Sequence, residues 1–166
     1  MIDGIMIILV IGVSGSGKTT VGEKLAEALQ YEFQDADDFH PPQNIEKMRQ
    51  NIPLNDRDRQ PWLQALNNAI QKWINLDKNV ILACSALKTE YRKQLLVDAD
   101  NIRLIYLQGS FELIENRLKQ RSDHYMKADL LQSQFEALEE PQTGIKIDIA
   151  QPIEEIIQKI ITELES

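Results

Sequence analysis

The feature that most constrains this chain is an octapeptide near its start, Gly12-Val13-Ser14-Gly15-Ser16-Gly17-Lys18-Thr19. It matches the pattern G-x-x-x-x-G-K-S/T, whose backbone N–H groups curl around the phosphates of a nucleotide. In that arrangement Lys18 reaches the β/γ-phosphates and the Thr19 hydroxyl can ligate Mg²⁺. An apolar run precedes the loop and a helical pattern follows it, which counts against a Gly/Ser-rich turn that matches only by chance. We expect Gly12–Thr19, with Thr20, to bind ATP.

Length, charge and cysteine content narrow the class of protein. The 166 residues predict one domain, 1–166, and the net charge of −8 argues against nucleic acid or an anionic membrane as the main partner. An acidic protein that binds ATP must therefore create its positive potential locally. The single cysteine, Cys84, excludes an internal disulfide and is expected to be a buried thiol. The N-terminal apolar stretch contains Asp3 and no basic leader, so we expect neither a signal peptide nor a membrane anchor, and a cytoplasmic location.

Short apolar runs alternate with helical patterns, which predicts a three-layer α/β fold with a mostly parallel five-stranded sheet flanked by helices. The expected strands are Ile5–Val13, Tyr31–Asp35, Val80–Cys84, Ile102–Leu107 and Ile145–Ile149. The expected helices are Thr19–Leu29, Asn44–Gln50, Arg57–Ile74, Lys88–Leu96, Phe111–Gln120, Leu130–Leu138 and Pro152–Leu164. Asp56, Ser110 and Asp129 are candidate N-caps. Ligands of such sheets bind at the carboxyl ends of the strands, so the residues just after each strand are the candidates for function.

Three carboxylates, Asp35, Asp37 and Asp38, follow the second expected strand. Beside a phosphate loop, one of them can hold Mg²⁺ through water and another can accept the proton of an attacking hydroxyl group. Side chains alternate along an extended segment, so Asp35 and Asp37 should share a side from which Asp38 points away. A solvated acidic turn is the alternative. His40 fits a substrate contact and a structural turn histidine equally well.

Three basic groups complete the candidate site. Arg57 or Arg59 could hold an anionic substrate, or both could be solvated. Lys88 and Arg92 lie one helical turn apart after the third strand, where a carboxylate or phosphate could bind, although a solvated helix face has the same spacing. Arg117 and Arg121 repeat that spacing at a helix end. They could complement the helix dipole, or belong to a helical lid over about 117–138 that covers the triphosphate.

These residues also carry a family resemblance that covers nearly the whole chain in order. The blocks that carry it are Gly12–Thr19, Asp35–Pro41, Asn44–Met48, Pro53–Leu63, Cys84–Lys88 with Tyr91 and Arg92, and Gln134–Pro141. Together they closely resemble gluconokinase, the small P-loop kind. The His-Pro step followed by Asn-Ile-Glu-Lys-Met is far more specific than the phosphate loop. Departures from the family pattern, such as Asp123 where a glycine is common before the lid histidine, touch no group that the chemistry requires.

The resemblance implies ATP-dependent phosphorylation of D-gluconate at its 6-hydroxyl, a nucleoside-monophosphate-kinase-like fold and a homodimer. In this interpretation Thr19 ligates Mg²⁺ with Asp35 behind it, and Asp37 accepts the hydroxyl proton. Arg117 and Arg121 close over the transferred phosphoryl group, while the substrate is held by His40, Arg59, Lys88 and Arg92. Two alternatives remain open: another small-molecule kinase of the same fold, acting on shikimate or a nucleotide, and a nucleotide-dependent switch. The chain contains no Asn-Lys-x-Asp segment for guanine recognition, which counts against the switch.

Overall fold

A parallel sheet forms the middle layer of the computed structural model, which describes residues 7–98, 100–120 and 128–165. Its strands are β1 (Ile7–Ile11), β2 (Glu32–Asp35), β3 (Val80–Cys84), β4 (Ile102–Gln108) and β5 (Ile145–Asp148). They lie in the order β2-β3-β1-β4-β5, and all neighbouring pairs are parallel. The helices are α1 (Lys18–Leu29), α2 (Pro42–Arg49), α3 (Asp56–Asn75), α4 (Thr89–Leu95), α5 (Phe111–Lys119), α6 (Ala128–Ala137) and α7 (Ile153–Glu165), with a 3₁₀-helix η1 at Ala36–Phe39. The predicted α/β class is confirmed.

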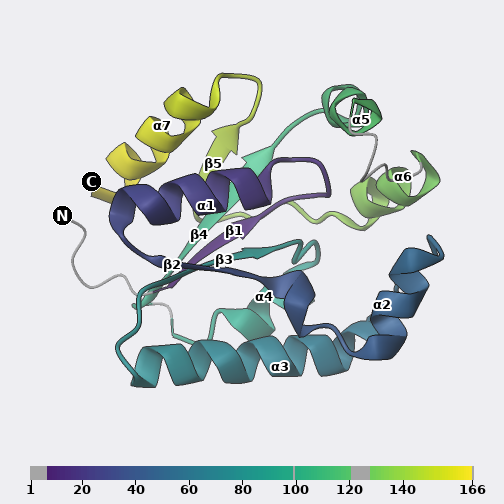
Figure 1. Cartoon of the computed structure of the whole chain (residues 1–166), viewed down its shortest axis with the longest axis horizontal. Coiled ribbons are helices and arrows are strands. Elements are labelled where there is room, and N and C mark those ends of the chain that lie inside the picture. Colours follow the sequence, from purple (N-terminus) through teal and green to yellow (C-terminus); the bar gives the residue numbers. More distant parts are fainter. Residues whose placement is uncertain (1–6, 99, 121–127, 166) are drawn as a thin grey trace.

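The side chains of the central strand β1 supply both cores of the protein. Ile8 and Val10 face one apolar cluster, while Ile7, Leu9 and Ile11 face the other, and all five are fully buried. Helices α1 and α7 cover the first face of the sheet, and α3 and α4 cover the second (Figure 1). Burial on both faces explains why β1 and β3 read as unbroken apolar runs in the sequence.

The helix ends follow local capping chemistry, with two differences from the sequence-based expectation. Ser110 caps α5, since its Oγ accepts from the Leu113 N–H at 3.1 Å. Helix α3, however, is capped by Asn55 and not by Asp56, because Asn55 and Asp58 form a reciprocal capping box that leaves Asp56 as the first helical residue. Asp129 lies inside α6, which begins at Ala128, so the prediction of an N-cap there is wrong.

The phosphate loop lies at the point where the strand order reverses. Strand β1 has β3 on one side and β4 on the other, and residues 12–17 connect its carboxyl end to α1. Open α/β sheets bind their ligands at such a switch point. Among the described residues no helix is long and apolar enough to cross a membrane.

Candidate active site

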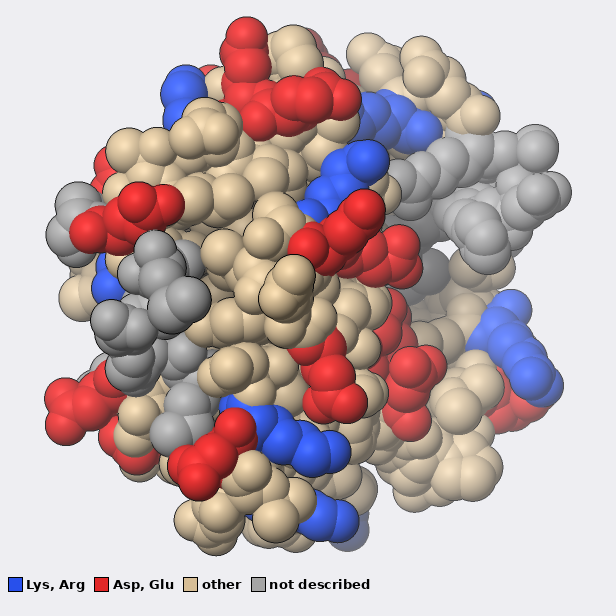
Figure 2. Space-filling view, turned by 60° about the vertical axis from the view of Figure 1, so that its left-hand side comes forward, with Lys and Arg blue, Asp and Glu red and all other residues tan. Residues whose placement is uncertain are grey.

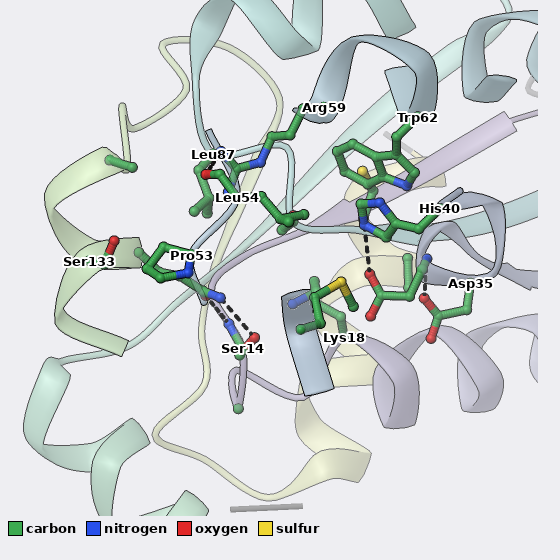
Figure 3. Close-up of a pocket in the computed structure, with 18 of the residues that line it drawn as sticks. Ser14, Lys18, Asp35, His40, Pro53, Leu54, Arg59, Trp62, Leu87 and Ser133 are labelled. Carbon is green, nitrogen blue, oxygen red and sulfur yellow. Dashed lines mark hydrogen bonds and ion pairs between the residues drawn. The ribbon is translucent and has the colours of Figure 1, made fainter. Parts of the chain in front are cut away.

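One pocket of about 1080 Å³ opens above the carboxyl ends of the strands. The phosphate loop and the start of α1 form one side, and η1, the start of α3 and the β3–α4 connection form the other. Leu118 of α5 and three residues of α6 (Ser133, Gln134 and Ala137) complete the wall. In Figure 3, Ser14 and Lys18 lie across this space from Arg59 and Leu87. The pocket therefore joins the segments that the sequence singled out.

Glycine is required at three positions of the phosphate loop by the path of the backbone. Gly15 and Gly17 have φ values of +83° and +96°, which L side chains rarely adopt, and a Cβ on Gly12 would lie 2.6 Å from the Ser16 Oγ. Lys18 folds back over the loop, its Nζ donating to the Val13 carbonyl at 3.0 Å. The predicted nucleotide-binding residues that face the pocket are Ser14, Gly15, Gly17, Lys18, Thr19 and Thr20. Gly12, Val13 and Ser16 are not among the lining residues.

Thr19 and Asp35 bring two oxygen ligands together at the start of α1. The Thr19 Oγ1 lies 3.5 Å from the Asp35 Oδ2, and both residues line the pocket. A hydroxyl and a carboxylate at this separation suit Mg²⁺, which prefers oxygen ligands and usually shares its coordination with phosphates and water. No group of three or more His, Cys, Asp or Glu residues able to hold a metal occurs in the described part of the chain. The residues present therefore fit an ion that is held jointly with the nucleotide.

Asp37 faces the pocket, as predicted, but for a different structural reason. The segment after Asp35 is the 3₁₀-helix η1 and not an extended strand end, and the Asp35 Oδ1 caps it by accepting from the Asp37 N–H at 2.9 Å. Asp37 lines the pocket whereas Asp38 is not among the lining residues. The side chain of Asp37 is 65% exposed. Desolvation by the surrounding pocket and the charge of Asp35 raise its pKa, while Lys18 lowers it.

His40 is buried against the pocket wall, with 9% of its surface exposed. Its ring stacks on Trp62 with centroids 4.5 Å apart and an interplanar angle of 9° (Figure 3). Burial and the nearby Arg59 charge lower its pKa to about 4, although Asp35 acts in the opposite direction. His40 is therefore neutral at pH 7. Its Nε2 lies 3.8 Å from the Asp37 Oδ1, so the two groups face each other without a direct hydrogen bond.

Arg59 and Lys88 converge on Asp56 and Tyr91 at the opposite end of the pocket. Arg59 donates through Nη1 to the Leu54 carbonyl at 2.8 Å and to the Tyr91 hydroxyl at 3.2 Å. Lys88 donates to the Asp56 Oδ1 at 2.9 Å, and the Tyr91 hydroxyl donates to the same oxygen. These bonds lower the pKa of Asp56 and raise that of Lys88. Arg57 is exposed and not among the lining residues, so the choice between Arg57 and Arg59 falls on Arg59.

Arg92 is placed differently from the sequence-based expectation of a substrate contact. Its residue surface is only 4% exposed, and it is not among the lining residues of the pocket. Nη1 donates to the carbonyls of Ala86 and Leu87, and Nη2 to the Thr89 hydroxyl and the Glu139 carbonyl. The guanidinium group therefore ties the segment after α6 to the β3–α4 connection. In this structure Arg92 therefore stabilises the β3–α4 connection, which contains Lys88.

The expected lid residues fall into two groups. Arg117 of α5 donates through Nη2 to the Ile149 carbonyl at 2.8 Å and is not among the pocket residues, so the structure does not bring it to the expected place over the phosphates. Arg121 lies outside the described residues.

Sequence reasoning missed Gln134, which accepts from the Ser14 N–H at 2.7 Å and donates to the Ser14 Oγ at 3.1 Å. Gln134 belongs to a block that resembles gluconokinase, and this was the one available signal.

The expectation of a local positive potential concerns how charged side chains are distributed between the surface and the pocket. Figure 2 shows acidic side chains spread widely over one face of the molecule, with basic side chains in small separate groups. The pocket lining gathers three cations, Lys18, Arg59 and Lys88, and they are matched in number by the carboxylates of Asp35, Asp37 and Asp56, so the lining has no excess of positive charge. Cys84 is buried and is one of the residues that line the pocket. Burial raises the pKa of its thiol to about 12, so the thiol is protonated at pH 7.

Comparison with known proteins identifies the family. A family model described as an AAA domain matches residues 7–141. Thermoresistant gluconokinase of Escherichia coli strain K12 is 45% identical over 159 residues, covering 93% of this chain and 91% of that protein. A probable gluconokinase of Dictyostelium discoideum is 42% identical over 172 residues, covering 96% and 86%. The crystal structure of a gluconokinase from Sinorhizobium meliloti 1021 matches with a TM-score of 0.88 and 39% identity, covering 98% of this chain and 93% of that one. The chain therefore belongs to the gluconokinase family of P-loop kinases.

Proposed function

We propose that this chain is an ATP-dependent kinase that phosphorylates D-gluconate at its 6-hydroxyl. The observation that carries the proposal is the composition of the pocket: a phosphate loop lies opposite a carboxylate, a neutral histidine and two cations. The first group of residues suits a triphosphate, and the second suits a polyol that ends in a carboxylate. The family membership favours this acceptor over shikimate or a nucleotide.

On the nucleotide side, the loop amides and Lys18 bind the phosphates and offset the charge that develops during transfer. Thr19 and Asp35 would hold Mg²⁺, which neutralises phosphate charge when bound. Gln134 holds the Ser14 side of the loop in place from α6. Arg117 and Arg121 remain proposed lid residues, although Arg117 would have to leave the Ile149 carbonyl to reach the phosphates.

On the acceptor side, Asp37 accepts the proton as the hydroxyl oxygen forms its bond to the γ-phosphorus and the bond to ADP breaks. Burial and the neighbouring charge of Asp35 raise the pKa of Asp37, which makes it a stronger base than an ordinary aspartate. Arg59 and Lys88 bind the carboxylate of the sugar acid at the far end of the pocket. Tyr91 orients Arg59 from behind through its hydroxyl group. We assign Arg92 the supporting role of holding the β3–α4 connection.

The wider setting is also part of the proposal. We propose a single kinase domain over 1–166, use of ATP with Mg²⁺, and a homodimer that acts in the cytoplasm without a nucleic-acid or membrane partner. Sedimentation equilibrium of the purified protein tests the dimer. Dependence of turnover on added Mg²⁺ after chelation tests the metal.

Release of ADP by the purified enzyme, measured with separate acceptors, tests the function. Gluconate should raise ADP formation far above the rate with ATP alone, whereas shikimate and adenosine monophosphate should not. Equal rates with all three acceptors, or a rate that no acceptor increases, would contradict the proposal. The second of these outcomes would favour a nucleotide-dependent switch.

A further inference from the structure

The buried side chain of Asn44 connects α2 and α3 directly behind His40. Asn44 is fully buried in α2, four residues after His40. Its Nδ2 lies 2.8 Å from the Asp58 carbonyl oxygen and 3.1 Å from the His40 Nδ1. A side-chain amide nitrogen carries two hydrogens and can serve both partners. The contact to Asp58 determines the orientation of the amide, because a carbonyl oxygen can only accept a hydrogen bond.

This orientation determines which nitrogen of His40 carries the proton. With Nδ2 facing the ring, the His40 Nδ1 must accept, so a neutral ring carries its hydrogen on Nε2. The ring is neutral at pH 7, since burial and Arg59 lower its pKa to about 4. The alternative orientation would place the Asn44 Oδ1 against the Asp58 carbonyl and remove the donor from that contact. Stacking on Trp62 holds the ring plane in place.

The Nε2 hydrogen lies on the side of the ring that faces Asp37. The 3.8 Å between the His40 Nε2 and the Asp37 Oδ1 is too long for a hydrogen bond between them. One hydroxyl oxygen can, however, lie about 2.8 Å from both atoms at once. Such a hydroxyl group would donate its hydrogen to the carboxylate and accept from the imidazole. The pair is thus suited to an alcohol and cannot treat a carboxylate in the same way, because a carboxylate has no proton to give Asp37.

We propose that Asn44 is a positioning residue that fixes His40 as the Nε2–H tautomer, so that His40 donates to the oxygen of the reacting hydroxyl group and Asp37 alone accepts its proton. The inference rests on the proposed function for the identity of that hydroxyl group. It separates the two candidate bases of the pocket: His40 has no lone pair on the side of the substrate, so it orients the alcohol and does not deprotonate it. The Asn44 Oδ1 is buried and has no hydrogen-bond partner within the described ranges, so the two bonds made by Nδ2 are the polar contacts of this side chain.

Long-range ¹H–¹⁵N correlation NMR of ¹⁵N-histidine-labelled protein at pH 7 reads the tautomer directly. The His40 signals are those that disappear in His40→Gln. In the wild-type protein we expect a protonated Nε2 and an unprotonated Nδ1. A protonated Nδ1 in the wild type would overturn the proposal, and this measurement needs neither a variant at Asn44 nor an acceptor.

Asn44→Asp provides the second arm, because a carboxylate accepts from Nδ1–H and should reverse the tautomer. We expect Nδ1 to become protonated and kcat with gluconate to fall about tenfold, the effect of one lost hydrogen bond. The KM for ATP should stay within about twofold, because Asn44 does not line the pocket. Asn68→Asp, the same change at an exposed position of α3, is the matched control and should alter neither the tautomer nor kcat.

The outcomes separate the two proposals. A folded Asn44→Asp variant with an unchanged tautomer, or with a reversed tautomer and unchanged kcat, would overturn the role of Asn44. If Asn44→Asp does not fold, the wild-type tautomer decides. If the wild-type tautomer is Nε2–H but gluconate is not phosphorylated, the proposed function fails while the assignment of the tautomer stands.

Discussion

Removing the guanidinium group of Arg92 should destabilise the fold rather than delete a substrate contact. Arg92→Met keeps much of the aliphatic length but removes every donor. The change leaves the carbonyl oxygens of Ala86 and Glu139 without the hydrogen bonds that they accept from Arg92, whereas the Leu87 carbonyl keeps a bond from the Glu139 N–H at 2.8 Å. The loop that carries Lys88 would keep two other hydrogen bonds to Glu139 after α6, one accepted by the Leu87 carbonyl and one donated by the Thr89 N–H.

The size of the effect follows from these contacts. A buried acceptor left without its partner costs about 1–3 kcal/mol, so the losses at the Ala86 and Glu139 carbonyls total at most roughly 2–6 kcal/mol. Burial lowers the pKa of Arg92, which shows that its charge is poorly hydrated, and removing a buried charge recovers part of this loss. Relaxation of the loop towards water recovers more. We therefore expect a net destabilisation of about 2 kcal/mol, or roughly 4–8 °C in Tm for a chain of this size.

Thermal unfolding and steady-state kinetics of the same variants test this reasoning. Lys93→Met is the matched control, because Lys93 is the exposed neighbour of Arg92 and such surface changes usually alter the free energy of unfolding by less than about 0.5 kcal/mol. If Arg92→Met keeps the wild-type Tm while the KM for gluconate rises at least tenfold, Arg92 contacts the substrate and the role assigned from the structure is wrong.

Four further results are expected. Lys18→Met should stay folded by circular dichroism but lose about 10²–10³ in kcat or more, because it removes charge stabilisation at the phosphates. Asp37→Asn should lower kcat by about 10²–10⁴ and Asp38→Asn should lower it little, since Asp37 lines the pocket and Asp38 is not among the lining residues. A larger loss in Asp38→Asn than in Asp37→Asn would exclude Asp37 as the base. Gln134→Ala should speed hydrogen exchange of the Ser14 amide by about tenfold, and unchanged exchange would show that this bond does not protect it. The pKa of His40 is lowered to about 4 from an ordinary 6.5, so between these pH values the unfolded chain binds a proton that the folded chain does not. The free energy of unfolding should therefore decrease as the pH is lowered from 6.5 to about 4, and it should decrease less steeply in His40→Gln.

The strands were the most predictable part of the fold. Val80–Cys84 was expected and observed at the same residues, because a strand buried on both faces must be apolar throughout. Local capping was less predictable, since Asn55 and Asp56 are both good N-caps. The reciprocal bond between Asn55 and Asp58 decides between them.

The candidate site was predictable where chemistry lies in a contiguous motif. The structure places residues of the phosphate loop and Asp35 in the pocket lining, where the sequence predicted the site, and their roles stay predictions. Asp37 also lines the pocket, but it does so from a 3₁₀-helix and not from the extended segment that was expected. Helical spacing identified Lys88 and Arg92 as a pair, but it did not predict that only the Lys88 side chain would face the pocket. The carbonyl partners of Arg92 include Glu139, 47 residues away, and no local pattern predicts that contact.

The position of the transferred phosphoryl group is the most direct test of the central claim that this pocket phosphorylates gluconate at its 6-hydroxyl. Proton–phosphorus correlation NMR of the product formed from ATP and gluconate distinguishes the hydroxyl groups. The account predicts one phosphomonoester whose phosphorus couples to the two protons of C6. A phosphorus signal coupled to a single proton, as at a secondary hydroxyl group, or the formation of inorganic phosphate alone, would contradict it.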